Sequence, residues 1–127
     1  MASPTHEDAQ LMLQLAQLGT AMIPPKARGW VWSDNFVQDP DEFQAKYPPG
    51  SDEFAYVNSI AAWHETIATL WKRELISEEL VFDWLWVAGM WERLKPVLVA
   101  QREGGVDELW TNFEAMAEAQ VASRAAV

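Results

Sequence analysis

Two long apolar stretches, joined by a very short turn, constrain the fold of this chain more than any other feature. In residues 52–74, apolar side chains recur at the three- and four-residue spacing of a helix face. Residues 78–103 follow a Ser77 cap and are apolar on nearly every side from Val81 to Leu94. Because the turn Leu75–Ser77 is so short, these two predicted helices must form an antiparallel pair.

Start and stop signals predict the remaining elements. Three further helices are expected, at 5–18 before Gly19, at 40–46 after the cap Asp39, and at 107–122. Pro96 is expected to kink the 78–103 helix without ending it, and the tail 119–127 is expected to fray. No strand pattern is present. The predicted fold is therefore all-α: one domain over 1–127, with a bundle of four main helices and a partly helical arm at residues 20–50.

The composition removes many kinds of chemistry. The 127 residues include no cysteine, which excludes disulfides, thiolate catalysis and cysteine-based metal sites. His6-Glu7 and His64-Glu65 begin like a zinc-protease helix, but the second histidine ligand is missing from both. Glycine-rich phosphate loops and the nucleophile elbow of hydrolases are also missing. We therefore expect no metal and no cofactor.

The charge balance bears on partners and location. Nine Lys and Arg against 19 Asp and Glu give a net charge of −10, and the basic residues are scattered along the chain. Nucleic-acid phosphates and anionic membranes both require clustered positive charge, so we expect neither as a partner. No apolar run is long enough to span a bilayer, and acids stand near the N-terminus where a secretory peptide needs positive charge. The expected location is the cytoplasm.

Eight tryptophans are the most unusual feature of the composition. One interpretation is an aromatic pocket for a flat ligand, a sugar or a cation, and the other is the large core area that a small helical domain needs. Most of them lie on apolar helix faces, which favours the core. Trp30 and Trp32 lie in the irregular arm, so we consider them as contacts to a ligand or partner. Trp86 is a further candidate contact, because a central helix leaves part of its surface uncovered.

Four titratable residues lie within apolar helix, and each has either a catalytic or a structural role. His64 is either a hydrogen-bonded core histidine or a general base, although Glu65 points about 100° away and cannot easily orient it. Three acids are embedded in apolar sequence: Asp83, Glu92 and Glu114. Each is either an acid/base group or the partner of a structural arginine or indole N–H. We assign no catalytic residue, and His64, Glu92 and Glu114 remain candidates.

The arm contains one basic residue with an expected structural role. We expect Arg28 to be held by a carboxylate, because the planar guanidinium grips a carboxylate at two points. Glu114 and Glu65 are the expected partners. Such a pair would clamp the arm to the bundle.

From about Pro24 to Gln120 the sequence resembles a family of small all-helical bacterial proteins known as a domain of unknown function. The resemblance rests on residues 27–32 (ARGWVW), 47–51 (YPPGS), 75–84 (LISEELVFDW), 91–93 (WER) and 110–114 (WTNFE). Two positions depart from the family pattern. Glu74 stands where the family tends to have a turn glycine, and His64 where it tends to have a bulky aromatic. The resemblance implies a fold and no reaction.

These observations lead to two hypotheses of different kinds. The first is a non-enzymatic interaction or assembly module, a homodimer or a subunit of a larger complex, because apolar helix surface exceeds what one small core requires. The alternative is a small-molecule binder or enzyme whose tryptophan-rich pocket contains Arg28, His64 and an embedded acid. A cavity lined by these polar groups would favour the alternative, and a flat exposed apolar face would favour the first.

Overall fold

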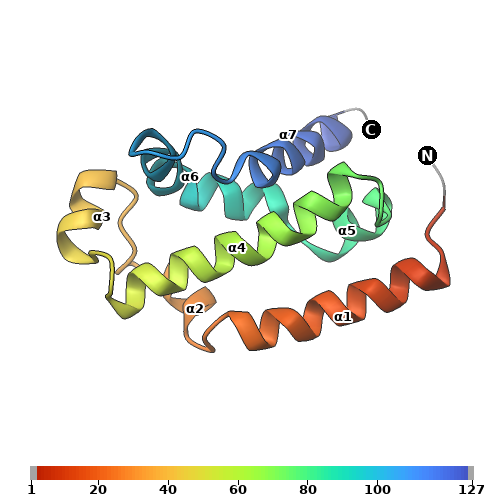
Figure 1. Ribbon diagram of the computed structural model, residues 1–127, viewed down its shortest axis with the longest axis horizontal. Coiled ribbons are helices and arrows are strands. Elements are labelled where there is room, and N and C mark those ends of the chain that lie inside the picture. Colours follow the sequence, from red (N-terminus) through yellow and green to blue (C-terminus); the bar gives the residue numbers. More distant parts are fainter. Residues whose placement is uncertain (1–2, 126–127) are drawn as a thin grey trace.

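The computed structural model of the chain describes residues 3–125, and every regular element among them is a helix. These residues form α1 (His6–Met22), α2 (Ala27–Val31), α3 (Pro40–Lys46), α4 (Asp52–Lys72), α5 (Glu78–Trp84), α6 (Val87–Glu103) and α7 (Thr111–Ala125). Figure 1 shows α4 running through the middle of the molecule, with α1 and α2 on one side and α6 and α7 on the other. The all-α prediction is confirmed.

Side-chain caps begin four of the helices. At α1, α3, α4 and α5 the cap side chain accepts a hydrogen bond from a first-turn amide, and the capping residues are Thr5, Asp39, Ser51 and Ser77. At α1 the cap is reciprocal, because the Asp8 carboxylate in turn accepts from the Thr5 amide at 2.9 Å. Each cap stabilises its helix by about 1 kcal/mol. These signals are local, so the sequence reveals them directly.

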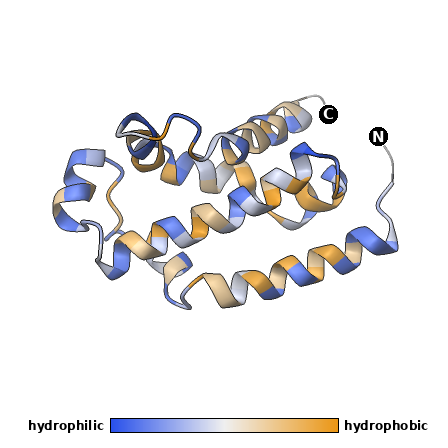
Figure 2. Ribbon diagram, viewed as in Figure 1, coloured by the Kyte–Doolittle hydropathy of each residue, from blue (hydrophilic) through white to orange (hydrophobic). Residues whose placement is uncertain are grey.

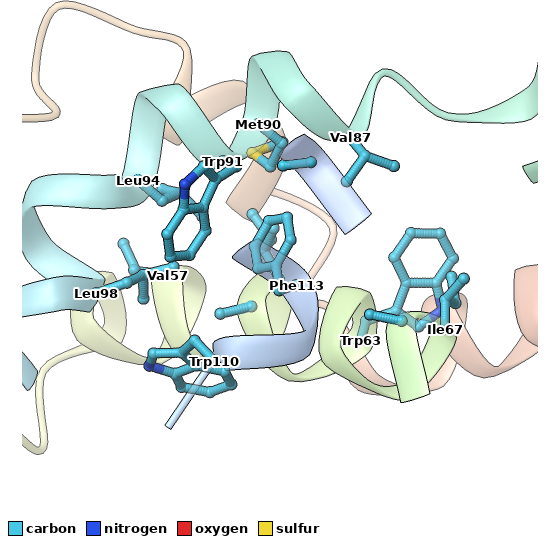
Figure 3. Packing of buried hydrophobic residues seen from close by; sticks show 14 of the residues in the cluster. Val57, Trp63, Ile67, Val87, Met90, Trp91, Leu94, Leu98, Trp110 and Phe113 are labelled. Carbon is cyan, nitrogen blue, oxygen red and sulfur yellow. The ribbon is translucent and has the colours of Figure 1, made fainter. Parts of the chain in front are cut away.

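The core lies where α4, α6 and α7 meet. Figure 2 shows bands of hydrophobic and hydrophilic residues alternating along α4, which is the pattern of a half-buried helix. At the centre Phe113 projects from α7 toward Trp91 of α6, with ring centroids 5.1 Å apart (Figure 3). The fully buried side chains around it include Val57, Ile60, Ile67, Val87, Leu94, Leu98 and Met116.

The chain reverses between α4 and α6, as the short turn predicts. The two helices run in opposite directions in Figure 1, and Gln101 near the end of α6 donates to Asn58 near the start of α4 at 2.9 Å. Helix α4 ends at Lys72 rather than at residue 74, because Glu74 has a left-handed φ of 58° that no helix continues through.

The prediction of a single helix over 78–103 is wrong. Helix α5 ends at Trp84, and Leu85 is extended, with φ −121° and ψ 137°, before α6 begins at Val87. No proline or glycine stands between the two helices, so the local sequence gives no reason for the break. Its cause lies on α7.

Gln120 of α7 holds the break in place. This side chain is fully buried, and its Oε1 accepts from the Ala88 amide at 2.8 Å. Its Nε2 donates to the carbonyl of Leu85 at 2.8 Å and to that of Phe82 at 3.5 Å. One side-chain amide thus replaces the helical hydrogen bonds that the interruption removes.

Pro96 lies inside α6, and the helix continues through it although proline usually interrupts a helix. Proline has no N–H, so the carbonyl four residues earlier, that of Glu92, loses its helical donor. Gln38, on the segment between α2 and α3, donates its Nε2 to the Glu92 carbonyl at 3.3 Å and to that of Arg93 at 3.0 Å. The helix therefore tolerates proline because a remote side chain supplies the missing donor.

Helix α1 passes beyond the predicted stop at Gly19 and ends at Met22. Gly19 is buried against α4, and a Cβ there would lie 2.9 Å from Trp63 Nε1. The same indole N–H donates to the Leu15 carbonyl at 2.8 Å. The glycine therefore serves close helix packing rather than termination.

The last helix also differs from its predicted bounds. Residues 107–110 form a turn, and Trp110 has a left-handed φ of 66°, so α7 begins only at Thr111. The Glu65 carboxylate of α4 then accepts from the Phe113 amide at 2.9 Å, in the first turn of α7. Of the tail expected to fray, residues 119–125 belong to α7, and 126–127 lie outside the described residues.

No helix in the described part of the chain is both long enough and apolar enough to cross a membrane.

Candidate functional site

Two tryptophans, Trp32 and Trp86, form an exposed pair on the surface. Their rings are nearly parallel, at an interplanar angle of 6° and with centroids 6.1 Å apart. Trp32 is 47% exposed and Trp86 is 61% exposed. Indole rings usually bury most of their area, so two adjacent exposed rings are unusual for a protein of this size. We call these two residues the tryptophan pair.

The helix break and a glycine place Trp86 in the pair. Trp86 is the residue just before α6, so its position depends on the interruption that Gln120 holds. Its indole lies directly against the backbone of Gly89, where an added Cβ would collide with the ring. Because Gly89 has no side chain, the ring lies flat on the first turn of α6.

Arg93 holds the other member of the pair in position. Its Nε donates to the Val31 carbonyl at 2.9 Å and its Nη2 to the Ser33 carbonyl at 3.0 Å, on either side of Trp32. The guanidinium carbon lies 5.6 Å from the Trp32 ring centroid and 4.9 Å from that of Phe36. These contacts fasten the end of α2 to α6 by charge-assisted hydrogen bonds and cation–π attraction.

The clamp predicted for Arg28 is thus made by a different arginine. No carboxylate pairs with Arg28 in residues 3–125, and its guanidinium carbon lies 5.2 Å from the Trp63 ring centroid instead. Glu114 pairs with Arg102 at 3.0 Å, and Glu65 caps α7. Both acids expected to hold Arg28 are therefore engaged elsewhere, and the prediction is wrong.

A cavity of about 240 Å³ opens on one side of the tryptophan pair. Its other walls come from α2, α4 and α6 and from the break itself: Arg28, Trp63, His64, Leu85 and Met90. Trp63 and Met90 also appear among the packed residues in Figure 3. We call this space the inner cavity. It brings together Arg28 and His64, which the sequence analysis grouped in one polar cluster, but no acid lines it.

His64 is a buried neutral histidine. Only 4% of it is exposed, and its ring stacks on Phe113 at 18° with centroids 4.8 Å apart. Its Nδ1 lies 2.8 Å from the Ile60 carbonyl. A carbonyl only accepts, so in the neutral ring Nδ1 carries the proton and Nε2 is left as an acceptor.

Burial lowers the pKa of His64 to about 4. Removal of water disfavours the charged imidazolium, and the positive charge of Arg28 lowers the pKa further, while the hydrogen bond to Ile60 acts in the opposite direction. His64 is therefore uncharged at neutral pH. No hydrogen bond engages its Nε2 within residues 3–125.

A second, shallower hollow of about 430 Å³ also borders the tryptophan pair. Besides the two rings, it is lined by Gln38, Ala88, Gly89, Glu92 and Arg93. We call the tryptophan pair together with these five residues the docking face. Glu92, expected to be embedded in apolar surroundings, is instead exposed on this face, and Asp83 is exposed on α5.

The other tryptophans singled out by the sequence contribute to packing. Trp30 lies at the centre of an aromatic cluster, with Tyr47 at 4.9 Å and Phe36 at 5.7 Å between ring centroids. Trp84 packs edge-on against Trp63 at 5.5 Å, and Trp91 is 3% exposed. Of the four predicted contact residues, Arg28, Trp32 and Trp86 thus lie together, and Trp30 lies in the cluster.

Sequence reasoning missed Gln120, Arg93 and Gly89. Gly89 did carry a signal, because a glycine inside an apolar helix costs stability and indicates close packing. Arg93 appeared only as part of the WER stretch that carries the family resemblance, and Gln120 carried no signal, since its partners lie far away in the chain. Within residues 3–125, no group of three or more histidine, aspartate or glutamate side chains is arranged to hold a metal ion.

The fold and the site together define an all-helical protein with an exposed tryptophan pair between two hollows. The family described as Domain of unknown function (DUF4760) matches residues 4–120, and the chain belongs to this family. The match also covers α1, which the resemblance noted from the sequence did not include. No curated protein and no solved structure matches the chain.

Proposed function

We propose that this protein is a non-enzymatic interaction module that binds a second copy of its own chain through the docking face. The observation that carries the proposal is the exposure of Trp32 and Trp86, at 47% and 61%. Tryptophan and arginine are the residues most often responsible for binding energy at the centre of protein interfaces. The docking face contains two tryptophans with Arg93 beside them.

The charges on the docking face are self-complementary. Glu92 and Arg93 are neighbours on it, and Glu92 is exposed. In a two-fold interface the same patch meets itself, and an arrangement that sets the Glu92 of one copy against the Arg93 of the other pairs unlike charges. The net charge of −10 opposes association at long range, but physiological salt screens this repulsion beyond about 8 Å.

The exposed rings supply a favourable free energy. Covering apolar surface contributes about 25 cal/mol per Å², so covering both rings of each copy contributes several kcal/mol before the entropy of association is subtracted. A stable interface buries about 800 Å² per partner. The tryptophan pair would form its centre, with the shallow hollow and the polar side chains as its rim.

Light scattering of the purified chain tests this proposal. At about 100 μM the wild type is expected to have twice the 14.4 kDa chain mass, and Trp86→Ala and Trp32→Ala to shift toward the monomer. Leu75→Ala is the matched control, because Leu75 is 62% exposed but lies in the turn after α4. A monomeric wild type contradicts the proposal, as does a dimer that all three variants leave intact.

A further inference from the structure

We propose that the inner cavity is a binding site for a small aromatic carboxylate that carries an N–H or O–H donor. This site shares Trp32 and Trp86 with the shallow hollow, and its remaining lining residues are different. The proposal goes beyond self-association, and it rests on three features of the cavity: its size and aromatic walls, the unpaired charge of Arg28, and the free acceptor of His64.

The size and walls of the cavity select a flat apolar body. Its volume is about 240 Å³, which exceeds the roughly 150 Å³ of an engineered cavity that takes up benzene. Three of its lining residues are tryptophans, and Leu85 and Met90 add aliphatic and thioether surface. One or two fused rings with a short side chain therefore fit, and indole faces stack favourably on such rings.

Arg28 supplies a positive charge that no acid within the described residues pairs with. Its guanidinium is exposed at the cavity, it rests over the Trp63 ring, and no ion pair engages it within residues 3–125. A guanidinium binds a carboxylate through two parallel hydrogen bonds. In a chain of net charge −10, an unpaired arginine beside a cavity favours a small anionic ligand.

His64 determines the second polar group of the ligand. Because Nδ1 donates its proton to the Ile60 carbonyl, Nε2 is left as an acceptor without a protein donor, and the small exposed part of this otherwise buried residue borders the cavity. A ligand N–H or O–H satisfies this acceptor, whereas a ligand without a donor leaves it unpaired when the cavity loses its water. The two polar groups thus select for a carboxylate at one point and a donor at another.

Isothermal titration calorimetry with three related probes tests the proposal on the wild type. Indole-3-acetate has both polar groups, 1-naphthaleneacetate lacks the N–H, and 3-methylindole lacks the carboxylate. We expect indole-3-acetate to bind about tenfold more tightly than either of the others, as one lost hydrogen bond or charge pair requires. Equal affinity for all three probes, or no heat from indole-3-acetate at about 1 mM, overturns the proposal.

Two variants assign the discrimination to its residues. His64→Phe keeps an aromatic ring against Phe113 and is expected to remove the preference for indole-3-acetate over 1-naphthaleneacetate. Arg28→Gln is expected to remove the preference over 3-methylindole. Arg73→Gln, at an exposed arginine at the end of α4, is the control and should keep both preferences. If the first two variants also keep both preferences, the inner cavity is not the site.

The inner cavity and the docking face share Trp32 and Trp86, but the variants distinguish ligand binding from self-association. Neither Arg28 nor His64 belongs to the docking face, so both variants should keep the mass of the wild type in light scattering. If the wild type is a monomer and still discriminates among the probes, self-association fails while the ligand site stands. A dimer that binds no probe gives the reverse result.

Discussion

At two points along residues 78–103 the structure differs from what the local sequence predicts, and in opposite ways. At Leu85 the helix breaks although no proline or glycine is present, and at Pro96 it continues although a proline is present. At each point, a different glutamine from a distant segment bonds to the backbone groups that are left free. Gln120 bonds to the groups left free by the break, and Gln38 donates to the carbonyl left free by Pro96.

The difference between the two points is burial, and it decides what each does for the protein. Gln120 is fully buried, so the groups it satisfies have no water to replace it. Gln38 is exposed, and water can substitute for its amide. The buried glutamine fixes the break that places Trp86 at the surface, whereas the exposed one only supports a helix that continues through Pro96.

Replacement of Gln120 is expected to have the largest effect. Gln120→Leu keeps the volume but leaves the Ala88 amide and the Leu85 carbonyl buried without partners, so the free energy of unfolding should fall by about 4 kcal/mol. Urea denaturation measures this loss. Gln17→Leu, at an exposed glutamine on α1, is the control and should change stability by less than about 0.5 kcal/mol. A comparable loss in both variants would refute the role of Gln120.

The distance in sequence between hydrogen-bond partners explains which parts of the fold the sequence could predict. The starts of α1, α3, α4 and α5 depend on caps within three residues, so the local pattern was sufficient. The break depends on Gln120, which is 32 residues from Ala88. An apolar pattern without proline or glycine gives no sign of such a partner, and the prediction of one continuous helix failed for that reason.

The second prediction concerns pH and the cavity beside the break. The folded pKa of His64 is about 4, below the usual 6.5, so between these values the unfolded chain binds a proton that the folded chain does not. Stability is complete above pH 6.5 and is lost as the pH falls toward 4. We expect a loss of about 2 kcal/mol from pH 7 to pH 5 that is absent in His64→Phe. Urea denaturation of both proteins at the two pH values measures the difference, and equal losses would contradict it.

The third prediction concerns the exposed glutamine. Gln38→Ala removes the donor to the Glu92 and Arg93 carbonyls, and because water replaces it we expect a loss of only about 1 kcal/mol. Thermal unfolding followed by circular dichroism is sufficient to detect this change. If Gln38→Ala costs as much as Gln120→Leu, the contrast drawn from burial is wrong.

The candidate site could be predicted only in part. The sequence selected Trp32 and Trp86 because a tryptophan in an irregular arm or on an all-apolar helix has no obvious partner. It selected Arg28 and His64 because each is a charged or titratable side chain in a largely apolar context. It did not reveal that Arg93 fastens the arm, since the acceptors are the backbone carbonyls of Val31 and Ser33, 62 and 60 residues away. Backbone acceptors exist at every residue, so no sequence pattern distinguishes them.

The central claim is that the geometry of the helix break presents Trp86 for binding, and Gly89→Ala tests it most directly. Alanine favours helix, so the variant should stay folded, but its Cβ occupies the place of the Trp86 ring and must displace it. Light scattering at about 100 μM is expected to give the dimer mass for the wild type and a mass near 14.4 kDa for the variant. A folded Gly89→Ala protein with the mass of the wild-type dimer would contradict the account.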